Sequence, residues 1–285
     1  MLVLFFFVLG LIVGSYLNVL VLRFGYRERV STRSHCAQCG TTLSVLDLVP
    51  LLSFIWLRGK CRSCKSKISL QYPIVELATG LVFALAASQV GEVENVYVQA
   101  AFVASLGFWA TLVAVVAYDI RHTLIPLPFI YVLYAFSIAY AALFALGTVS
   151  PVLLIDSLLG AFVCGGFFAL LHALTRGRGM GIGDAYVAGA VGLYFGVDAA
   201  LVIIALSVWS GALIGLIGVG VTKVFPHVRL EVAGLRVTLL SEIPFAPFLA
   251  LGAIGVAALP ILVQWFGVSG LGTWFAHSLL WNFWW

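Results

Sequence analysis

The sequence predicts an all-α, polytopic membrane protein with about eight transmembrane helices. Hydrophobic residues make up 63% of the 285 residues and charged residues only 9%, whereas a soluble domain carries about 25% charged residues. Apolar segments recur along the chain, and a helix needs about 20 such residues to cross a bilayer. Lys and Arg fall only in alternate connecting loops. The chain has too little polar surface to cover a water-soluble globule, so its solvent is expected to be lipid.

The first apolar segment, Met1–Leu22, is expected to be a retained helix. It lacks the preceding basic residue and the small-residue cleavage site of a signal peptide. The stretch Ala185–Val197 is short for a full crossing, so its helix either starts below the membrane surface or has a buried turn. The other expected helices lie near Tyr72–Gly91, Val98–Tyr118, Leu124–Leu146 and Val152–Leu174, between about Asp198 and Thr222, and at about Ile243–Val263.

The distribution of basic residues predicts the orientation of the helices. If residues 23–71 are cytosolic, the other loops on that side are 119–123, 175–184 and 223–242. These four loops hold 9, 1, 2 and 3 Lys and Arg residues, which are all 15 in the chain. Such residues are enriched in cytosolic loops. We therefore expect a multi-pass protein of the bacterial inner membrane with both termini outside, lipid around it and no nucleic acid partner.

Three regions are expected along the chain. Residues 1–22 form the first transmembrane helix, and residues 23–71 form a small cytosolic loop between the first two helices. Residues 72–285 form a seven-helix transmembrane domain that carries all four of the acidic candidates named below and ends in an outer aromatic tail. Tryptophans near the C-terminus are typical of an aromatic belt at the membrane interface; they are Trp265, Trp274, Trp281, Trp284 and Trp285.

The cytosolic loop contains two C-x2-C pairs, Cys36 with Cys39 and Cys61 with Cys64. Two such pairs supply four soft ligands in the arrangement that tetrahedral zinc prefers. Gly40, directly after the first pair, suits a tight turn. The alternative is two disulfides, but a cytosolic loop lies in a reducing compartment. The loop is therefore expected to hold a structural zinc ion, which would supply folding energy to a segment with little apolar material.

Four acidic residues lie at the expected cytosolic ends of helices: Glu76, Asp119, Asp184 and Glu242. Acidic residues at membrane depth are costly, which makes them functional candidates. For Asp119 the alternative is an interfacial anchor, and for Asp184 it is a helix N-cap favoured by the helix dipole. Gly181 and Gly183 precede Asp184 and permit a close backbone approach to its carboxylate.

Asp119 and Asp184 together suggest a hydrolytic reaction. Two carboxylates held close to each other cannot both ionise easily, so they share a proton. The ionised carboxylate then takes a proton from water, the water attacks a peptide carbonyl, and the protonated carboxyl donates to the carbonyl oxygen or to the leaving nitrogen. The sequence does not assign these two parts to particular aspartates.

Several segments in order along the chain resemble one protein family. They are Gly14–Val19, the two cysteine pairs, Pro50–Ser53, Arg58–Cys61, Gln71–Glu76, Asp119 followed by Ile125 and Pro126, the G-x-G-D run Gly181–Asp184, and Ile243–Phe248. G-x-G-D alone is unspecific, but the ordered set is specific. By these motifs the chain is similar to the type IV prepilin leader peptidase/N-methyltransferases, which are intramembrane aspartyl peptidases.

The resemblance implies an aspartic endopeptidase with Asp119 and Asp184 as catalytic residues. Its expected substrates are type IV prepilins or the pseudopilins of type II secretion, cut at the cytosolic membrane face after a short basic leader. Family members often also methylate the new N-terminus with S-adenosylmethionine. No nucleotide-binding loop is recognisable in the sequence, so this second activity follows from the resemblance alone, with Glu76 and the zinc loop as candidate locations.

Two other functions remain open at this point. A proton-coupled transporter would use the membrane carboxylates as a relay, although such a relay should include carboxylates deep in the span. A preflagellin-type peptidase is the second alternative, although such relatives generally lack the cysteine loop.

Overall fold

The computed structural model describes residues 1–24, 33–90, 95–177, 180–224, 231–232, 235–236 and 244–266. The chain divides into two compact units. Unit 1 comprises Met1–Glu92 and Trp109–Tyr118, and unit 2 comprises Val93–Phe108 and Asp119–Trp285. Glu242 and the tail from residue 267, both of which carry predictions from the sequence, lie outside the described residues.

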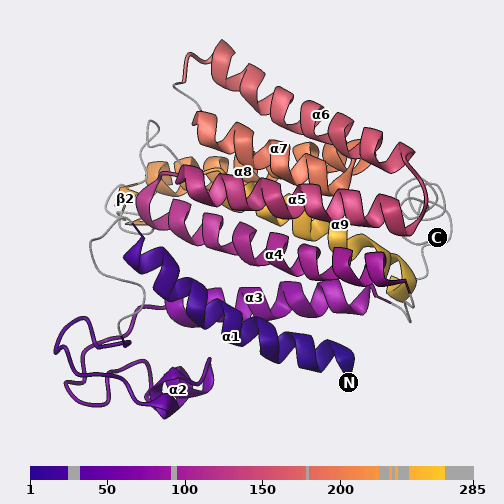
Figure 1. Cartoon of the computed structure of the whole chain (residues 1–285). Helices are drawn as coiled ribbons and strands as arrows, with labels where there is room; N and C mark the ends of the chain where they lie inside the picture. Colours follow the sequence, from indigo (N-terminus) through magenta and orange to yellow (C-terminus); the bar gives the residue numbers. More distant parts are fainter. Residues whose placement is uncertain are drawn as a thin grey trace. The chain divides into compact units, whose positions relative to one another are not determined.

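Eight helices, α1 and α3 to α9, account for most of the described chain; Figure 1 labels them. Six have the length and composition to cross a membrane: α1 (Leu2–Arg23), α3 (Gln71–Ser88), α4 (Val96–His122), α5 (Leu127–Gly147), α6 (Val152–Leu174) and the Val197–Ile217 part of α8 (Val197–Val224). Two further apolar segments are shorter, namely α7 (Ile182–Phe195) and the Ala246–Leu259 part of α9 (Ala246–Phe266).

The remaining regular elements are small. The loop of unit 1 contains the 3-10 helix η1 (Val45–Leu48) and the short helix α2 (Leu52–Trp56). In unit 2, the two-residue strands β1 (Glu231–Val232) and β2 (Leu235–Arg236) form an antiparallel pair. The predicted all-helical membrane class is therefore confirmed, with six long candidate spans.

In unit 1, α1 and α3 pack side by side through glycines (Figure 1). A Cβ at Gly10 would lie 2.8 Å from the Cα of Gly80, and one at Gly14 would lie 2.7 Å from the Cα of Glu76. Small residues let membrane helices approach this closely, because dispersion contacts replace the hydrophobic effect in lipid. Next to this seam lies an apolar cluster from three helices, made of Leu17, Val21, Val75, Ala114 and Ala117.

In unit 2, the 14-residue helix α7 is buried along nearly its whole length. Glycines again permit the contact: a Cβ at Gly165 of α6 would lie 3.0 Å from the Cα of Gly189 in α7, and one at Gly192 would lie 2.8 Å from the Cβ of Cys164. Because its neighbours cover it, α7 does not need the length of a lipid-exposed span. The short helix expected after Asp184 is thus present.

The junction between α7 and α8 is a tight turn at Gly196, whose φ is +80°. Glycine tolerates this backbone conformation without strain. The carboxylate of Asp156, on α6, accepts a hydrogen bond from the N–H of Val197 at 3.3 Å. It thereby satisfies one of the N–H groups at the start of α8 and links the turn to α6.

Candidate active site and metal centre

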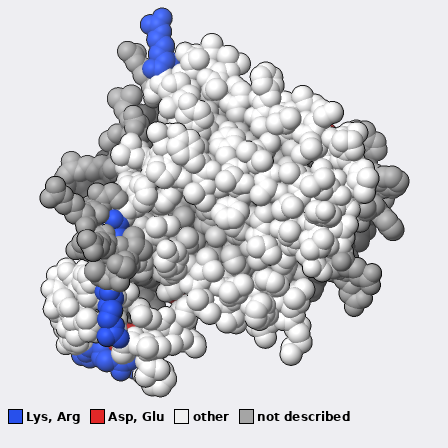
Figure 2. All heavy atoms as spheres, viewed as in Figure 1, with Lys and Arg blue, Asp and Glu red and all other residues white. Residues whose placement is uncertain are grey.

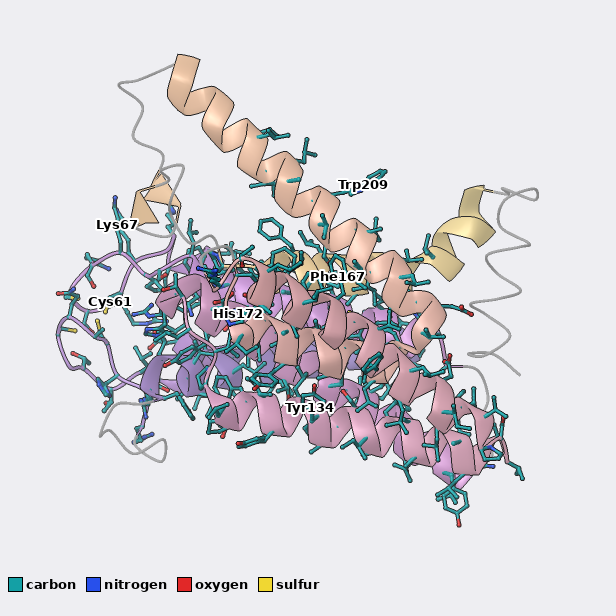
Figure 3. All side chains as sticks on the ribbon, turned by 90° about the horizontal axis from the view of Figure 1, so that it is seen from above. Cys61, Lys67, Tyr134, Phe167, His172 and Trp209 are labelled. Atoms are coloured by element: carbon teal, nitrogen blue, oxygen red, sulfur yellow. The ribbon has the colours of Figure 1, made fainter. Side chains whose placement is uncertain are left out.

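The four loop cysteines gather in unit 1. Their sulfur atoms all lie within 4.8 Å of one another, and all four are free thiols; Figure 3 shows the sulfurs near the label of Cys61. The two pairs have matching turns, because Gly40 N–H donates to the Cys36 carbonyl at 2.9 Å and Lys65 N–H donates to the Cys61 carbonyl at 3.1 Å. Gly40 and Lys65 both have positive φ, at 68° and 60°.

This donor set fits a tetrahedral metal ion. Zinc takes four cysteine thiolates in closed structural sites, and thiolates rather than thiols are the ligands. A hydrogen bond from the backbone N–H of Cys39, and to a smaller extent one from that of Gln38, lowers the pKa of the Cys36 thiol to about 6. The turn around the first pair therefore already favours the ligating form of that thiol.

Asp47 ties the loop together, a role that the sequence analysis missed. Its Oδ2 accepts hydrogen bonds from the Ser44 hydroxyl at 2.7 Å and the Ser44 N–H at 3.1 Å. Its Oδ1 pairs with Nε of Arg62, between the second pair of cysteines, at 2.8 Å. The hydrogen bond from the Ser44 hydroxyl, and to a smaller extent the one from Arg62, lowers the pKa of Asp47 below its usual value. The signal in the sequence was the capping-box spacing from Ser44 to Asp47.

Asp119 and Asp184 both lie in unit 2 and are both buried, with 4% and 8% of their surfaces exposed. Asp119 is on the last turn of α4, which continues to His122 instead of ending at the aspartate as the predicted boundary implied. The N–H of Ala246, the first residue of α9, donates to its carboxylate. Oδ2 of Asp119 has no hydrogen-bond partner among the described residues.

Asp184 is the third residue of α7, since the N-cap is Gly181. The alternative of Asp184 itself as the N-cap is therefore wrong. The N–H of Gly181 donates to the Asp184 carboxylate, and Asp119 lies near enough to interact with it electrostatically. A Cβ on Gly183 would lie 3.4 Å from side-chain atoms of Ile125. The segment that follows Asp119 along the chain thus packs against the turn that carries Asp184.

His172 fastens the same turn from the last residues of α6, where Figure 3 labels it. Its Nδ1 lies 2.8 Å from the carbonyl oxygen of Met180. A carbonyl only accepts, so Nδ1 must carry the hydrogen. The ring also covers Gly177, whose φ is +74°. The sequence alone does not reveal this contact, because the partner of His172 lies outside its own helix.

Glu76 belongs to unit 1, where it is 7% exposed on α3. Its Oε2 accepts the N–H of Leu51 at 2.9 Å, and the side chain of Ser15 also hydrogen-bonds to its carboxylate. The carboxylate is thus held between α1, α3 and the start of α2. Glu242, another of the four acidic candidates, lies outside the described residues.

Comparison with known proteins gives consistent matches over most of the chain. Residues 8–90 match the bacterial peptidase A24 N-terminal domain, and residues 104–216 match the type IV leader peptidase family. A Bacillus subtilis prepilin leader peptidase/N-methyltransferase is 32% identical over 253 residues, covering 87% of this chain and 90% of that protein. A type 4 prepilin-like proteins leader peptide-processing enzyme of Escherichia coli is 33% identical, covering 89% and 92%.

A third relative, the prepilin leader peptidase/N-methyltransferase of Myxococcus xanthus, is 33% identical over 218 residues. That match covers 75% of this chain but only 62% of the relative, less than two thirds of its length. No solved structure gave a significant match. The order of motifs along the chain, the helical membrane fold and the curated relatives agree: this chain belongs to the bacterial prepilin leader peptidase/N-methyltransferase family, and is a multi-pass membrane enzyme.

Proposed function

We propose that this enzyme removes the basic leader of type IV prepilins or pseudopilins with Asp119 and Asp184 as its catalytic dyad. The observation that carries the proposal is the arrangement in unit 2, where the aspartates of α4 and α7 are both buried and lie near enough for the charge of Asp119 to act on Asp184. Two carboxylates so placed share one proton between them. The family matches favour this reaction over a proton-coupled transporter.

The chemistry divides between the two carboxyl groups. One is ionised and removes a proton from a water molecule, whose oxygen forms a bond to the scissile carbonyl carbon. The other is protonated and donates to the carbonyl oxygen as the C=O bond opens. The tetrahedral intermediate then expels the peptide nitrogen, which takes a proton from the dyad. Oδ2 of Asp119, which has no hydrogen-bond partner among the described residues, leaves an acceptor for the attacking water.

The proposed setting is the bacterial inner membrane, with eight crossings, both termini outside and the cysteine loop in the cytosol. In Figure 2, Lys and Arg are concentrated on that loop, as expected for a cytosolic segment. An apolar substrate helix can remain in lipid while its leader junction meets the carboxylates at the cytosolic interface. The proposed regions are residues 1–22, 23–71 and 72–285, the last being the catalytic domain.

For the metal, we propose one structural zinc ion held by Cys36, Cys39, Cys61 and Cys64. All four positions of a tetrahedral ion are then filled by protein, so the ion contributes folding energy to the loop and takes no part in hydrolysis. For the second activity, methyl transfer from S-adenosylmethionine, the buried carboxylate of Glu76 is the candidate contact in unit 1.

The dyad is tested by digesting a prepilin-like peptide with the purified enzyme in detergent. Asp119→Asn and Asp184→Asn should each abolish cleavage, because neither amide can exchange the shared proton. Asp198→Asn is the matched control, since it makes the same chemical change at an exposed residue of unit 2, and it should cleave normally. Cleavage by either dyad variant at the wild-type rate would refute the assignment.

A further inference from the structure

A buried polar seam between α1 and α3 contains an asparagine whose hydrogen bonds are incomplete. Asn18 is 0% exposed, and its Nδ2 donates to the carbonyls of Gly14 at 3.2 Å and Tyr72 at 3.1 Å. Its Oδ1 is buried and has no hydrogen-bond partner among the described residues. An acceptor left in this state is costly, so the seam is built to receive a hydrogen-bond donor.

Glu76 lies one helical turn from Tyr72 on the same helix and adds a buried carboxyl group to this seam. Its described hydrogen bonds come from Leu51 and Ser15, which are both neutral groups. Within the described part of the chain, the one ion pair joins Arg62 to Asp47. No Lys, Arg or His of the described residues therefore forms an ion pair with Glu76. Buried carboxylates are normally paired with a cation, and here that partner is missing from the described chain.

The backbone beside Glu76 is held in an unfavourable conformation. Leu51, whose N–H binds the carboxylate, has a φ of +58°, which L-residues with a Cβ rarely adopt. Strained backbone of this kind concentrates at ligand and active sites. The loop is therefore held against Glu76 by the hydrogen bond from Leu51 N–H. A carboxylate has about four lone-pair sites, so Glu76 can still accept further hydrogen bonds.

We infer that the Asn18–Glu76 seam binds a protonated primary amine. An ammonium group supplies the positive charge that Glu76 lacks and the N–H donors that Asn18 Oδ1 lacks. A sulfonium carries charge but no hydrogen, and a hydroxyl carries hydrogen but no charge, so neither satisfies both acceptors. Given the proposed function, on which this inference rests, the amine is the new N-terminus that cleavage creates and methylation consumes.

S-adenosylmethionine also carries a primary ammonium, so the experiment must separate the two sources. The probe is a lysine-free peptide that starts at the residue after the cleavage site, either with its free amine or N-acetylated. Binding of both peptides and of S-adenosylmethionine to the full-length enzyme in detergent is measured by calorimetry, which requires no turnover. The variant is Glu76→Gln, which keeps the size of the side chain and an acceptor for Leu51 N–H.

Thr79→Val is the matched control, because Thr79 is a buried polar residue one turn further along α3 whose hydroxyl donates to the Val75 carbonyl of its own helix at 2.7 Å. Wild type and Thr79→Val should bind the free-amine peptide about tenfold or more tightly than the acetylated one, as expected for a charge-assisted hydrogen bond. Glu76→Gln should lose that preference while its thermal unfolding stays close to that of the control.

A Glu76→Gln variant that binds the peptides normally but S-adenosylmethionine about tenfold more weakly would support the ammonium site and assign it to the methyl donor. An unchanged preference for the free amine, together with unchanged affinity for S-adenosylmethionine, would overturn the inference. Cleavage is assayed separately on the same preparations. If the amine preference depends on Glu76 but no variant or wild type cleaves a precursor, then the proposed function fails and the amine site stands.

Discussion

Replacing Gly160 by alanine should reduce cleavage by displacing α7. A Cβ at this position of α6 would meet the Gly192 carbonyl oxygen and would lie 2.6 Å from the carbonyl carbon of Gly196 and 2.7 Å from its oxygen. These are backbone atoms, which cannot rotate away. For the Gly196 carbonyl carbon the spacing must grow from 2.6 Å to the 3.4 Å at which ordinary van der Waals contact begins, and the Gly192 oxygen is nearer still, so the displacement is at least about 0.8 Å.

The displacement should affect activity more than stability. Overpacking lowers the free energy of unfolding by about 1–3 kcal/mol, but alanine stabilises a helix by about 1 kcal/mol relative to glycine. The free energy of unfolding should therefore fall by only about 0–2 kcal/mol. Asp184 lies on the displaced helix, and a misplacement of about 1 Å can lower an enzymatic rate about 100-fold. We therefore expect cleavage to fall by roughly one to two orders of magnitude.

The assay is kcat/KM for a prepilin-like peptide in detergent, with thermal unfolding measured on the same samples. Gly166→Ala is the control, because it makes the identical change on the same helix where no atom lies within 4 Å of the new Cβ. It should leave cleavage unchanged. If Gly160→Ala and Gly166→Ala cleave equally well, the argument that the glycine contact sets the position of Asp184 is refuted.

Three further predictions concern the loop and the turn before α7. Chelation or Cys61→Ser should lower the metal content from one ion per chain to none, measured by plasma mass spectrometry, and should make the loop sensitive to protease. Asp47→Asn should weaken the hold on Arg62 by roughly 0.2–1 kcal/mol, read as a few-fold faster loss of metal to a chelator. The pKa of Asp47 is lowered in the folded protein, so its stabilisation of the loop is complete above the ordinary pKa of about 3.9 and is lost only as the pH falls through the folded pKa. The difference in metal loss between wild type and Asp47→Asn should therefore stay constant from about pH 5 to 8. His172→Ala should lower kcat several-fold with little change in KM, and His172→Asn should restore it by donating to the Met180 carbonyl.

Each of these predictions has a result that would contradict it. A metal content that survives Cys61→Ser would remove that cysteine from the ligand set. A difference between wild type and Asp47→Asn that already disappears near pH 6 would mean that another group titrates in its place. Equal activity of the alanine and asparagine variants at residue 172 would show that the hydrogen bond does not position the turn.

Features that depend on neighbours in the sequence were the ones that the sequence predicted well. The apolar segments gave the helical membrane class, since each helix closes its own backbone hydrogen bonds and needs only length and composition to span lipid. The two C-x2-C pairs predicted a four-cysteine cluster, because each pair makes its own turn. The predicted turn at Gly40 has its counterpart at Lys65, where a residue with a Cβ adopts the same positive φ.

Contacts between distant segments could be found only in the tertiary structure. The sequence placed Asp119 and Asp184 at helix ends, but their burial in one unit depends on how α4, α7 and α9 pack. The hydrogen bond from His172 to Met180 crosses a turn whose geometry no local pattern specifies. The sequence also does not reveal that the Asn18 oxygen lacks a partner in the described part of the chain, because whether a polar atom has a partner depends on every segment that folds around it.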